Sequence, residues 1–131
     1  MIANIIFVAL GGGLGSVCRY LCGFIPAPEL GGFPIVTMLI NFVGALIIGV
    51  LAELVDNSMV TYFNISEKMG LFFKVGFCGG FTTFSTFSLE MFNLLDNGKV
   101  GMAVSYGVIS VIICLLGVIL GRYLVKTFCI R

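Results

Sequence analysis

The chain has no histidine and little charge of either sign. Its 131 residues include seven Lys or Arg and six Asp or Glu, which gives a formal net charge of +1. Histidine is the commonest metal ligand and the usual general base, so its absence argues against a metalloenzyme and against acid–base catalysis. A net charge near zero provides no basic field that would attract nucleic acid. The sequence also has no nucleotide-binding motif, and we predict a protein that is not an enzyme.

Apolar residues make up most of the chain. Sixty per cent of the residues are hydrophobic and 10% are charged, and the mean hydropathy is +1.19. A soluble domain carries about 25% charged residues. A soluble domain of this composition would leave much of its apolar surface exposed to water. The sequence therefore predicts a multi-pass membrane protein, surrounded by lipid.

Four apolar stretches of membrane length divide the chain. A transmembrane helix needs about 20 apolar residues. The predicted spans cover about 2–25, 33–55, 69–95 and 100–125. The connections are short, and Asp96-Asn97-Gly98 is a strong turn signal. The first stretch is too long for the apolar part of a signal peptide and lacks a positive leading region. We predict one all-α transmembrane domain, 1–131, with four helices per subunit.

Five cysteines lie in or beside the apolar stretches, at positions 18, 22, 78, 114 and 129. The pair Cys18 and Cys22 has no second pair, so the spacing is a weak zinc signal. Cysteine in such surroundings is usually a small, soft packing residue. We interpret all five as reduced packing residues.

The third apolar stretch contains a polar run, Gly-Gly-Phe-Thr-Thr-Phe-Ser-Thr-Phe-Ser, at 79–88. Polar or irregular backbone at membrane depth is tolerated only where it is buried in protein or lines a cavity. Gly79 and Gly80 weaken a helix, and Thr82 and Thr83 are β-branched. The sequence therefore predicts a third helix broken near its middle. A break frees backbone carbonyls, which could coordinate a cation.

Phenylalanines recur every third residue in this run. Phe84 and Phe87 would lie roughly on one helix face, with the hydroxyls of Ser85 and Thr86 beside them. Aromatic rings are negative on the face and positive at the edge, so a ring edge can contact a small, hard anion weakly. Hydroxyl groups supply ordinary donors. Weak, repeated contacts suit conduction, because an ion must leave as readily as it enters. For any single ring, the alternative is plain packing.

Small residues recur at helical spacing in the first and fourth spans. Gly11 and Gly15 are four residues apart, and so are Gly117 and Gly121. Such spacing lets helices approach closely in lipid, and a tight helix bundle explains these glycines. The same face of the fourth span carries Tyr106, Ser110 and Cys114.

Two polar residues lie within the first two spans. An arginine inside a span is costly unless it snorkels, pairs or faces water. Arg19 lies near the end of its span and could snorkel to the interface, so an anchoring role and a functional role both remain open. Asn41 is deeper and can both donate and accept hydrogen bonds. For Asn41 we favour a functional role.

The polar residues occupy only one half of the membrane. With four spans, Arg19, Asn41, the second half of 79–88 and Tyr106 all lie from mid-membrane towards the side away from the termini. An inverted second copy would supply the other half, as inverted repeats do in transporters. The bias of Lys and Arg between the two sides is only a few charges, so the chain could insert both ways. We therefore predict an antiparallel, dual-topology homodimer. The same charge bias leaves open a heterodimer with a paired, oppositely oriented homologue.

The run at 79–88 closely resembles the signature of the small fluoride channels, the Fluc or CrcB family. Other segments resemble the same family over the whole chain. These are Gly11-Gly12-Gly13-Leu14-Gly15 with Arg19-Tyr20, the segment Thr37 to Asn41, the extension Ser88-Leu89-Glu90, and Tyr106 with Ser110. The ten-residue run is highly specific, whereas the glycine-rich start alone would be a weak signal.

The resemblance implies a fluoride pathway and names its residues. A dual-topology homodimer would hold two pathways, lined by the ring edges of Phe84 and Phe87. Asn41 would donate to the ion, Tyr106 and Ser110 would belong to a polar track, and Arg19 would lie near the vestibule. Position 114 is cysteine where some relatives carry serine, and a thiol is a weaker donor than a hydroxyl.

The resemblance also implies a structural sodium ion at the dimer centre. Its ligands would be the backbone carbonyls of Gly79 and Thr82 from both subunits. The implied function is passive export of fluoride from the cytoplasm, which relieves fluoride toxicity. Fluoride that enters as the neutral acid would leave as the anion, driven by an inside-negative potential.

Two other functions remain open on the residues alone. One is a small multidrug-type, proton-coupled exporter. Such a protein needs a carboxylate deep in its first span, which this chain lacks, and Glu90 in the third span is the only candidate. The other is a non-transporting structural membrane subunit, which would leave the polar run at 79–88 unexplained.

Overall fold

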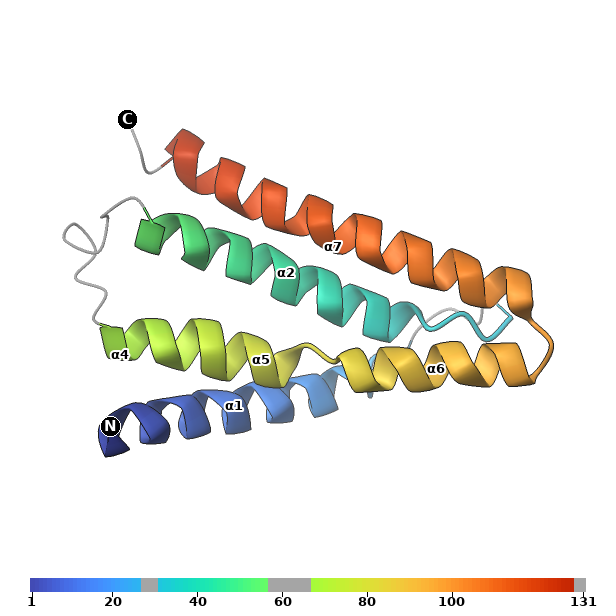
Figure 1. Ribbon diagram of the computed structural model, residues 1–131, viewed down its shortest axis with the longest axis horizontal. Coiled ribbons are helices and arrows are strands. Elements are labelled where there is room, and N and C mark those ends of the chain that lie inside the picture. Colours follow the sequence, from blue (N-terminus) through green and yellow to red (C-terminus); the bar gives the residue numbers. More distant parts are fainter. Residues whose placement is uncertain (27–30, 57–66, 129–131) are drawn as a thin grey trace.

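A computed structural model describes residues 1–26, 31–56 and 67–128 of the chain (Figure 1). These residues form helices and connecting turns, with no strand among them. The helices are α1 (Ile2–Cys22), α2 (Ile35–Asp56), α4 (Glu67–Gly70), the π-helix η1 (Leu71–Phe77), α5 (Cys78–Phe81), α6 (Phe84–Asp96) and α7 (Val100–Phe128). The prediction of an all-α fold is confirmed.

Three helices are long and apolar enough to cross a membrane. They are α1, the segment Ile35–Val55 of α2, and α7, with mean hydropathies of 1.7, 2.5 and 2.6. The remaining apolar stretch is divided into α4, η1, α5 and α6, so none of its pieces reaches membrane length alone. A membrane protein is therefore confirmed by length and composition, and the four span boundaries stay predictions.

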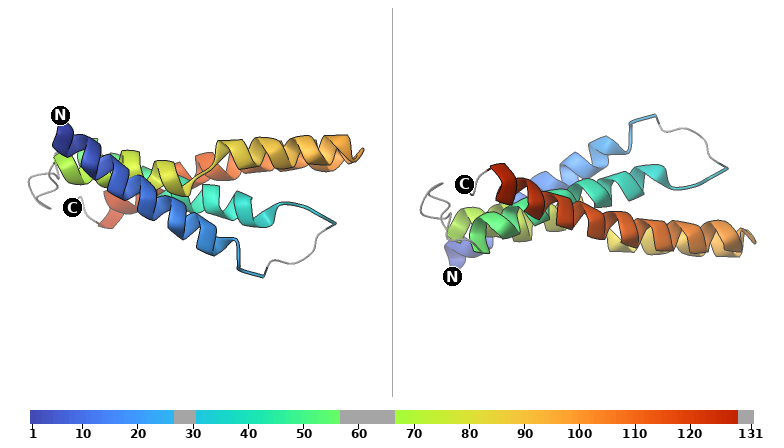
Figure 2. Two further views of the ribbon diagram at one scale, coloured as in Figure 1. Left: turned by 90° about the horizontal axis from the view of Figure 1, so that it is seen from below. Right: turned by 90° about the horizontal axis from the view of Figure 1, so that it is seen from above.

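The helices pack as two close pairs. α1 lies along η1 and α5, and α2 lies along α7. α5 contacts α2 and joins the two pairs, while α6 packs on α7 (Figure 2). α1 begins and α7 ends at one end of the molecule, and the turn between α6 and α7 lies at the other (Figure 1).

Glycines make the close approach within both pairs possible. Gly11 and Gly15 of α1 are buried against backbone, and a Cβ there would collide with the carbonyls of Phe72 and Phe77. On the second pair, a Cβ at Gly121 of α7 would collide with the Leu46 carbonyl of α2. The predicted packing role of these glycines is confirmed.

The π-helix η1 runs directly into α5. The N–H of Cys78 donates to the carbonyl of Phe73, five residues earlier, in the bonding pattern of a π-helix. Gly76 of η1 is buried, and a Cβ there would meet the Val8 carbonyl of α1. At Gly76 the backbone of the π-helix therefore lies directly against the backbone of α1.

A buried carboxylate fastens α2 to α7 near the end where α7 finishes. Glu53 is 1% exposed, and Arg122 Nε donates to its Oε2 at 2.6 Å. Lys126 Nζ lies 3.7 Å from Oε1. Removing one partner of a buried pair leaves an uncompensated charge, so the three groups stabilise each other as a unit. The hydropathy pattern gave no indication of this cluster.

Two glycines of α1 provide a matched test of the packing. We expect Gly15→Ala to destabilise the protein by on the order of 1–3 kcal/mol, because the new methyl would force α1 away from η1 and α5. Gly13→Ala is the control, because no atom lies within 4 Å of its Cβ position. Thermal unfolding of the detergent-purified protein measures both. Equal melting temperatures for the two variants would contradict the close approach.

Candidate functional site

The helix break lies at Thr82 and Thr83, where the sequence predicts it. Both residues are extended, with φ −79° and ψ 160° at Thr82 and φ −149° and ψ 115° at Thr83. The last turn before the break is closed by Thr82, whose N–H and hydroxyl both donate to the carbonyl of Cys78, at 3.0 and 2.8 Å. The break thus separates α5 from α6 while the N–H and the hydroxyl of Thr82 both keep a hydrogen-bond acceptor.

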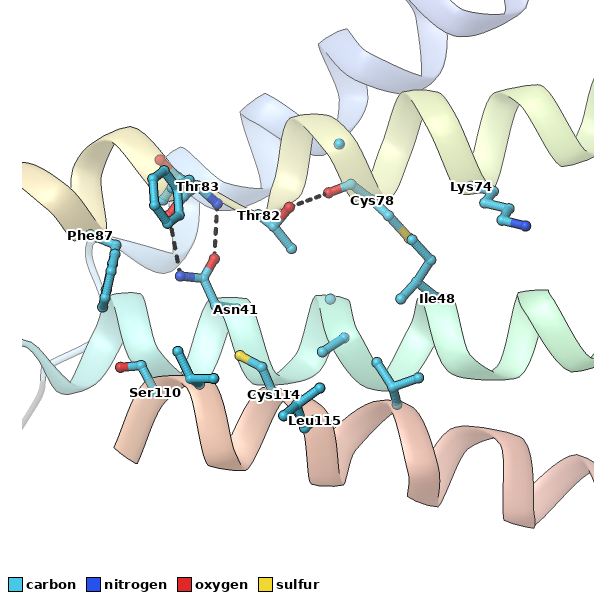
Figure 3. A pocket seen from close by; sticks show the side chains of 16 residues that line it. Asn41, Ile48, Lys74, Cys78, Thr82, Thr83, Phe87, Ser110, Cys114 and Leu115 are labelled. Carbon is cyan, nitrogen blue, oxygen red and sulfur yellow. Dashed lines mark hydrogen bonds between the residues drawn. The ribbon is translucent and has the colours of Figure 1, made fainter. Parts of the chain in front are cut away.

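The amide of Asn41 on α2 bridges the break. Its Oδ1 accepts from the Thr83 N–H at 2.8 Å, and its Nδ2 donates to the Thr83 carbonyl at 3.2 Å (Figure 3). Thr83 is 6% exposed, so its backbone groups would otherwise be buried without partners. The second N–H of the Asn41 amide is not used in this bridge and remains a possible donor.

The bridge changes the hydrogen bonding of the preceding helix. In a continuous α-helix the Thr83 N–H would bond to the carbonyl of Gly79, four residues earlier. Because that N–H bonds to Asn41, the Gly79 carbonyl loses its helical partner. The C-terminal end of a helix carries a partial negative charge. The Gly79 carbonyl, which only the family resemblance makes a cation ligand, is therefore at the electronegative end of α5.

Thr83 also caps the N-terminus of α6. Its hydroxyl oxygen accepts from the Thr86 N–H at 3.1 Å and donates to Thr86 Oγ1 at 2.9 Å. The Ser85 hydroxyl lies 3.3 Å from the same oxygen. The two predicted donors, Ser85 and Thr86, are therefore exposed hydroxyls gathered around the cap. The cap fixes where α6 begins.

Phe84 and Phe87 follow the cap and lie side by side on α6. Their ring centroids are 5.7 Å apart, with an interplanar angle of 38°. The ring of Phe87 also packs on Tyr106 of α7, 5.0 Å between centroids. Phe84 is 79% exposed. The predicted common face of the two rings is present, with one ring held by α7 and the other open.

Glu90 joins three helices beside these rings. Its Oε1 accepts from the Thr37 hydroxyl of α2 at 2.7 Å, and its Oε2 accepts from the Tyr106 hydroxyl of α7 at 2.8 Å. Tyr106 is completely buried. The phenol proton of Tyr106 is therefore already bound to a carboxylate. Glu90 also lines a shallow pocket with Asn93 and Lys99, which opens towards the turn between α6 and α7.

Ser110 has a buried hydroxyl with no hydrogen-bond partner among the described residues. It lies one helical turn after Tyr106 and is 5% exposed. An unsatisfied buried polar group costs about 1–3 kcal/mol, so its presence calls for an explanation. Ser110 itself is among the residues that line the groove containing the break (Figure 3).

This groove has a volume of about 470 Å³ and is bounded by α2, η1, α5, α6 and α7. Its polar lining residues lie around the break and at both ends of the groove. The lining residues are Asn41, Gly44, Ala45, Ile48, Lys74, Cys78, Gly79, Thr82, Thr83, Phe84, Phe87, Ser110, Val111, Cys114, Leu115 and Val118. Most predicted site residues therefore line the same groove. They include Gly79 and Thr82, whose carbonyls are the predicted cation ligands.

Arg19 lies beside the break but outside the groove lining. Its Nη1 is 3.5 Å from the Thr82 carbonyl, at the limit of a hydrogen bond. The guanidinium therefore turns towards the protein backbone. An anchoring role and a vestibule role were both open from the sequence, and this contact adds a third, in which Arg19 supports the break.

Sequence reasoning named three residues without giving them the roles that they have in the site. Thr83 is the capping and bridging residue, and Thr37 and Glu90 form the three-helix hydrogen-bond cluster with Tyr106. Threonine is among the preferred N-cap residues, so Thr83 at the break was a recognisable candidate to begin α6. Thr37 lies one turn before Asn41, so helical spacing also placed it on the correct face. Nothing local pairs Glu90 with residues on α2 and α7.

Helices of membrane length and a polar groove at a capped helix break define a helical membrane protein with a polar groove between its helices. The family model described as CrcB-like protein, Camphor Resistance (CrcB), matches residues 6–122. The chain belongs to this family. The family assignment predicted from the run at 79–88 is therefore confirmed.

Curated relatives cover nearly the whole chain. A protein of Ruminiclostridium cellulolyticum is 41% identical over 125 residues, which are 95% of this chain and 93% of its own length. One of Francisella philomiragia is 41% identical over 92% of this chain and 93% of its own length. One of Bacteroides fragilis is 41% identical over 95% of this chain and 98% of its own length. Each is named fluoride-specific ion channel FluC.

The Asn41 bridge predicts a specific loss of stability. We expect Asn41→Leu to cost about 1–3 kcal/mol for each backbone group of Thr83 that it orphans. The same substitution at Asn93, which is exposed on α6, should change stability little. Thermal unfolding in detergent measures the difference, and amide hydrogen exchange at Thr83 locates it. Slow, unchanged exchange at Thr83 in Asn41→Leu would show that the bridge is dispensable.

Proposed function

We propose that the protein is a passive, fluoride-selective channel of the inner membrane that exports fluoride from the cytoplasm and so relieves its toxicity. Curated relatives at 41% identity are named fluoride-specific ion channels. The single observation that best supports transport is the buried, unpartnered hydroxyl of Ser110 in the groove beside Phe87. A donor without a protein acceptor is available to a passing anion. The function is transport and not catalysis.

The groove offers fluoride weak and neutral contacts. The Ser110 hydroxyl and the spare Asn41 N–H are hydrogen-bond donors, and the edges of Phe84 and Phe87 carry partial positive charge. An ion held only by such groups can leave, as conduction requires. Thr86, Ser85 and Tyr106 complete the proposed pathway, with the Tyr106 phenol acting through its bond to Glu90. Arg19 acts at the mouth or by supporting the break.

An antiparallel second copy would complete the pathway. The groove is open along one side, Phe84 is 79% exposed, and Gly79 is exposed with nothing within 4 Å of its Cβ position. Ring edges facing lipid would serve no purpose for an anion. A second identical subunit, inserted upside down, would cover these groups and supply polar groups for the other half of the membrane. The single four-helix domain, 1–131, is the unit of this homodimer.

A structural sodium ion fits the carbonyls at the break. Gly79 has lost its helical partner to the Asn41 bridge, and Gly79 and Thr82 both line the open groove. Carbonyl oxygens are hard ligands of the type that hard cations prefer. Two carbonyls from each subunit would surround the ion at the dimer centre. Such an ion would stabilise the dimer and add positive charge near the anion path.

Fluoride efflux from liposomes tests the proposal. The reconstituted protein should release fluoride rapidly when a potassium ionophore clamps the voltage, and should release no chloride. A fluoride-selective electrode measures the flux. Absence of flux would favour a structural subunit, and flux that requires a proton gradient would favour an exporter that uses Glu90.

The ring edges predict a loss of flux without a loss of assembly. We expect Phe84→Ile and Phe87→Ile each to reduce fluoride efflux by about tenfold, because an aliphatic chain has no positive edge. Phe92→Ile is the control, since Phe92 is exposed on the same helix and outside the groove. Size-exclusion chromatography verifies that the dimer persists. Full efflux from both groove variants would remove the ring-edge contribution.

Ser110 predicts opposite effects on stability and on flux. Ser110→Ala removes an unsatisfied hydroxyl, so we expect stability to rise by about 1 kcal/mol and efflux to fall about fivefold. Ser105→Ala serves as the control, because Ser105 on the same helix already donates to the Met102 carbonyl at 3.0 Å. Thermal unfolding and efflux are measured on the same preparations. Reduced stability in Ser110→Ala would indicate that the hydroxyl has a structural partner.

A further inference from the structure

Lys74 is the charged residue of the groove, and nothing in the proposed pathway accounts for it. All other groove-lining residues, which lie entirely within the described part of the chain, are neutral. Lys74 is partly buried on η1, and its ammonium makes no hydrogen bond or ion pair with a described residue. An ionisable residue at membrane depth is expensive unless it pairs or faces water. The cationic groups around Glu53 are, by contrast, paired.

Lys74 and the neutral donors occupy opposite ends of the same groove. Figure 3 shows Ser110 and Phe87 at one end, Asn41 beside the break, and Lys74 beyond Cys78 at the other end. Lys74 precedes the break by eight residues, which is about 12 Å along a helix. Half of the hydrocarbon core is about 15 Å thick. With the break near the midplane, Lys74 lies close to the boundary between the hydrocarbon core and the headgroup interface. From there its flexible stem can place the ammonium either in the groove or in the interface.

We infer that Lys74 forms a cationic subsite for a small anion at the end of the groove away from Ser110. This inference rests on the proposed function and adds a residue to the anion path. A positive charge in a narrow space with apolar walls raises the local concentration of anions. Rings of Lys or Arg serve anion pores in this way. The neutral donors at the other end then accept the ion without holding it tightly.

In the proposed antiparallel dimer, this subsite would occur at both ends of each paired groove. Inversion about the break would set the Lys74 end of one copy at the depth of the Ser110 end of the other. Each paired groove would then have a lysine at both ends, one from each copy. Anions would be attracted equally from either side of the membrane.

A charge series at position 74 tests the inference. Fluoride efflux is measured at low fluoride concentration and at low and high ionic strength for wild type, Lys74→Arg, Lys74→Gln and Lys74→Glu. We expect Lys74→Arg to stay within about twofold of wild type, Lys74→Gln to lose about five- to tenfold, and Lys74→Glu to lose more. High ionic strength should reduce these differences, because salt screens the charge.

The control is Lys68→Gln, which removes the same charge from exposed α4, outside the groove. We expect its efflux to stay within about twofold of wild type, because the removed charge is screened by solvent. If Lys74→Gln does not assemble, the comparison of Lys74→Arg with Lys74→Glu carries the test.

The outcomes separate this inference from the proposed function. If Lys74→Gln and Lys74→Glu both release fluoride as fast as the wild type, the subsite is overturned and the channel proposal stays intact. Equal losses in Lys74→Arg and Lys74→Gln would also overturn it, because only packing at position 74 would then matter. A wild-type protein that passes no fluoride would overturn both.

Discussion

The structure depends on the pair of hydrogen bonds between the Asn41 amide and the backbone of Thr83. A helix break inside a membrane leaves N–H and C=O groups that water cannot reach, and each would cost several kcal/mol if it stayed unpaired. One side chain on α2 satisfies both groups of Thr83. The same contact frees the Gly79 carbonyl and positions the cap of α6, from which Phe84 and Phe87 follow. The polar site is therefore a consequence of how the break is stabilised.

Two carboxylates hold α2 in place around this contact. Near one end of α2, Glu53 binds Arg122 and Lys126 of α7, and near the other end Thr37 binds Glu90, which also accepts from Tyr106 of α7. Asn41 lies between these two attachments. A helix held on both sides of Asn41 keeps its amide within hydrogen-bond distance of Thr83. Close glycine contacts do the same for α1 against η1 and α5.

Much of this fold could be predicted from local signals. Mean hydropathy marked the apolar stretches, and Gly79, Gly80, Thr82 and Thr83 marked the break. The spacing of Gly11 and Gly15 marked a close helix contact. Each of these signals depends on residues near one another in the chain. The run at 79–88 was specific enough to indicate the family.

The partners across the fold could not be predicted in the same way. The bridge from Asn41 to Thr83 spans 42 residues of sequence, and the pairing of Glu53 with Arg122 spans 69. Sequence reasoning gave Asn41 a role towards the ion because its amide was deep and polar. It could not show that the Asn41 oxygen and nitrogen both form hydrogen bonds with the backbone of Thr83. Sequence reasoning also could not show that the Ser110 hydroxyl is buried without a hydrogen-bond partner among the described residues, because this depends on how α2, α6 and α7 pack together.

The π-helix η1 has a consequence for how the third apolar segment tolerates insertions and deletions. A π-helix accommodates one more residue per hydrogen-bonded ring than an α-helix does. Deleting one residue from Leu71–Phe77 could therefore restore α bonding while turning the chain before the deletion by about 100°. Gly76 would then lose its alignment with α1, or Lys74 its position in the groove, although hydropathy would hardly change. The one extra residue of the π-helix thus sets how the residues before η1 are rotated about the helix axis relative to those after it.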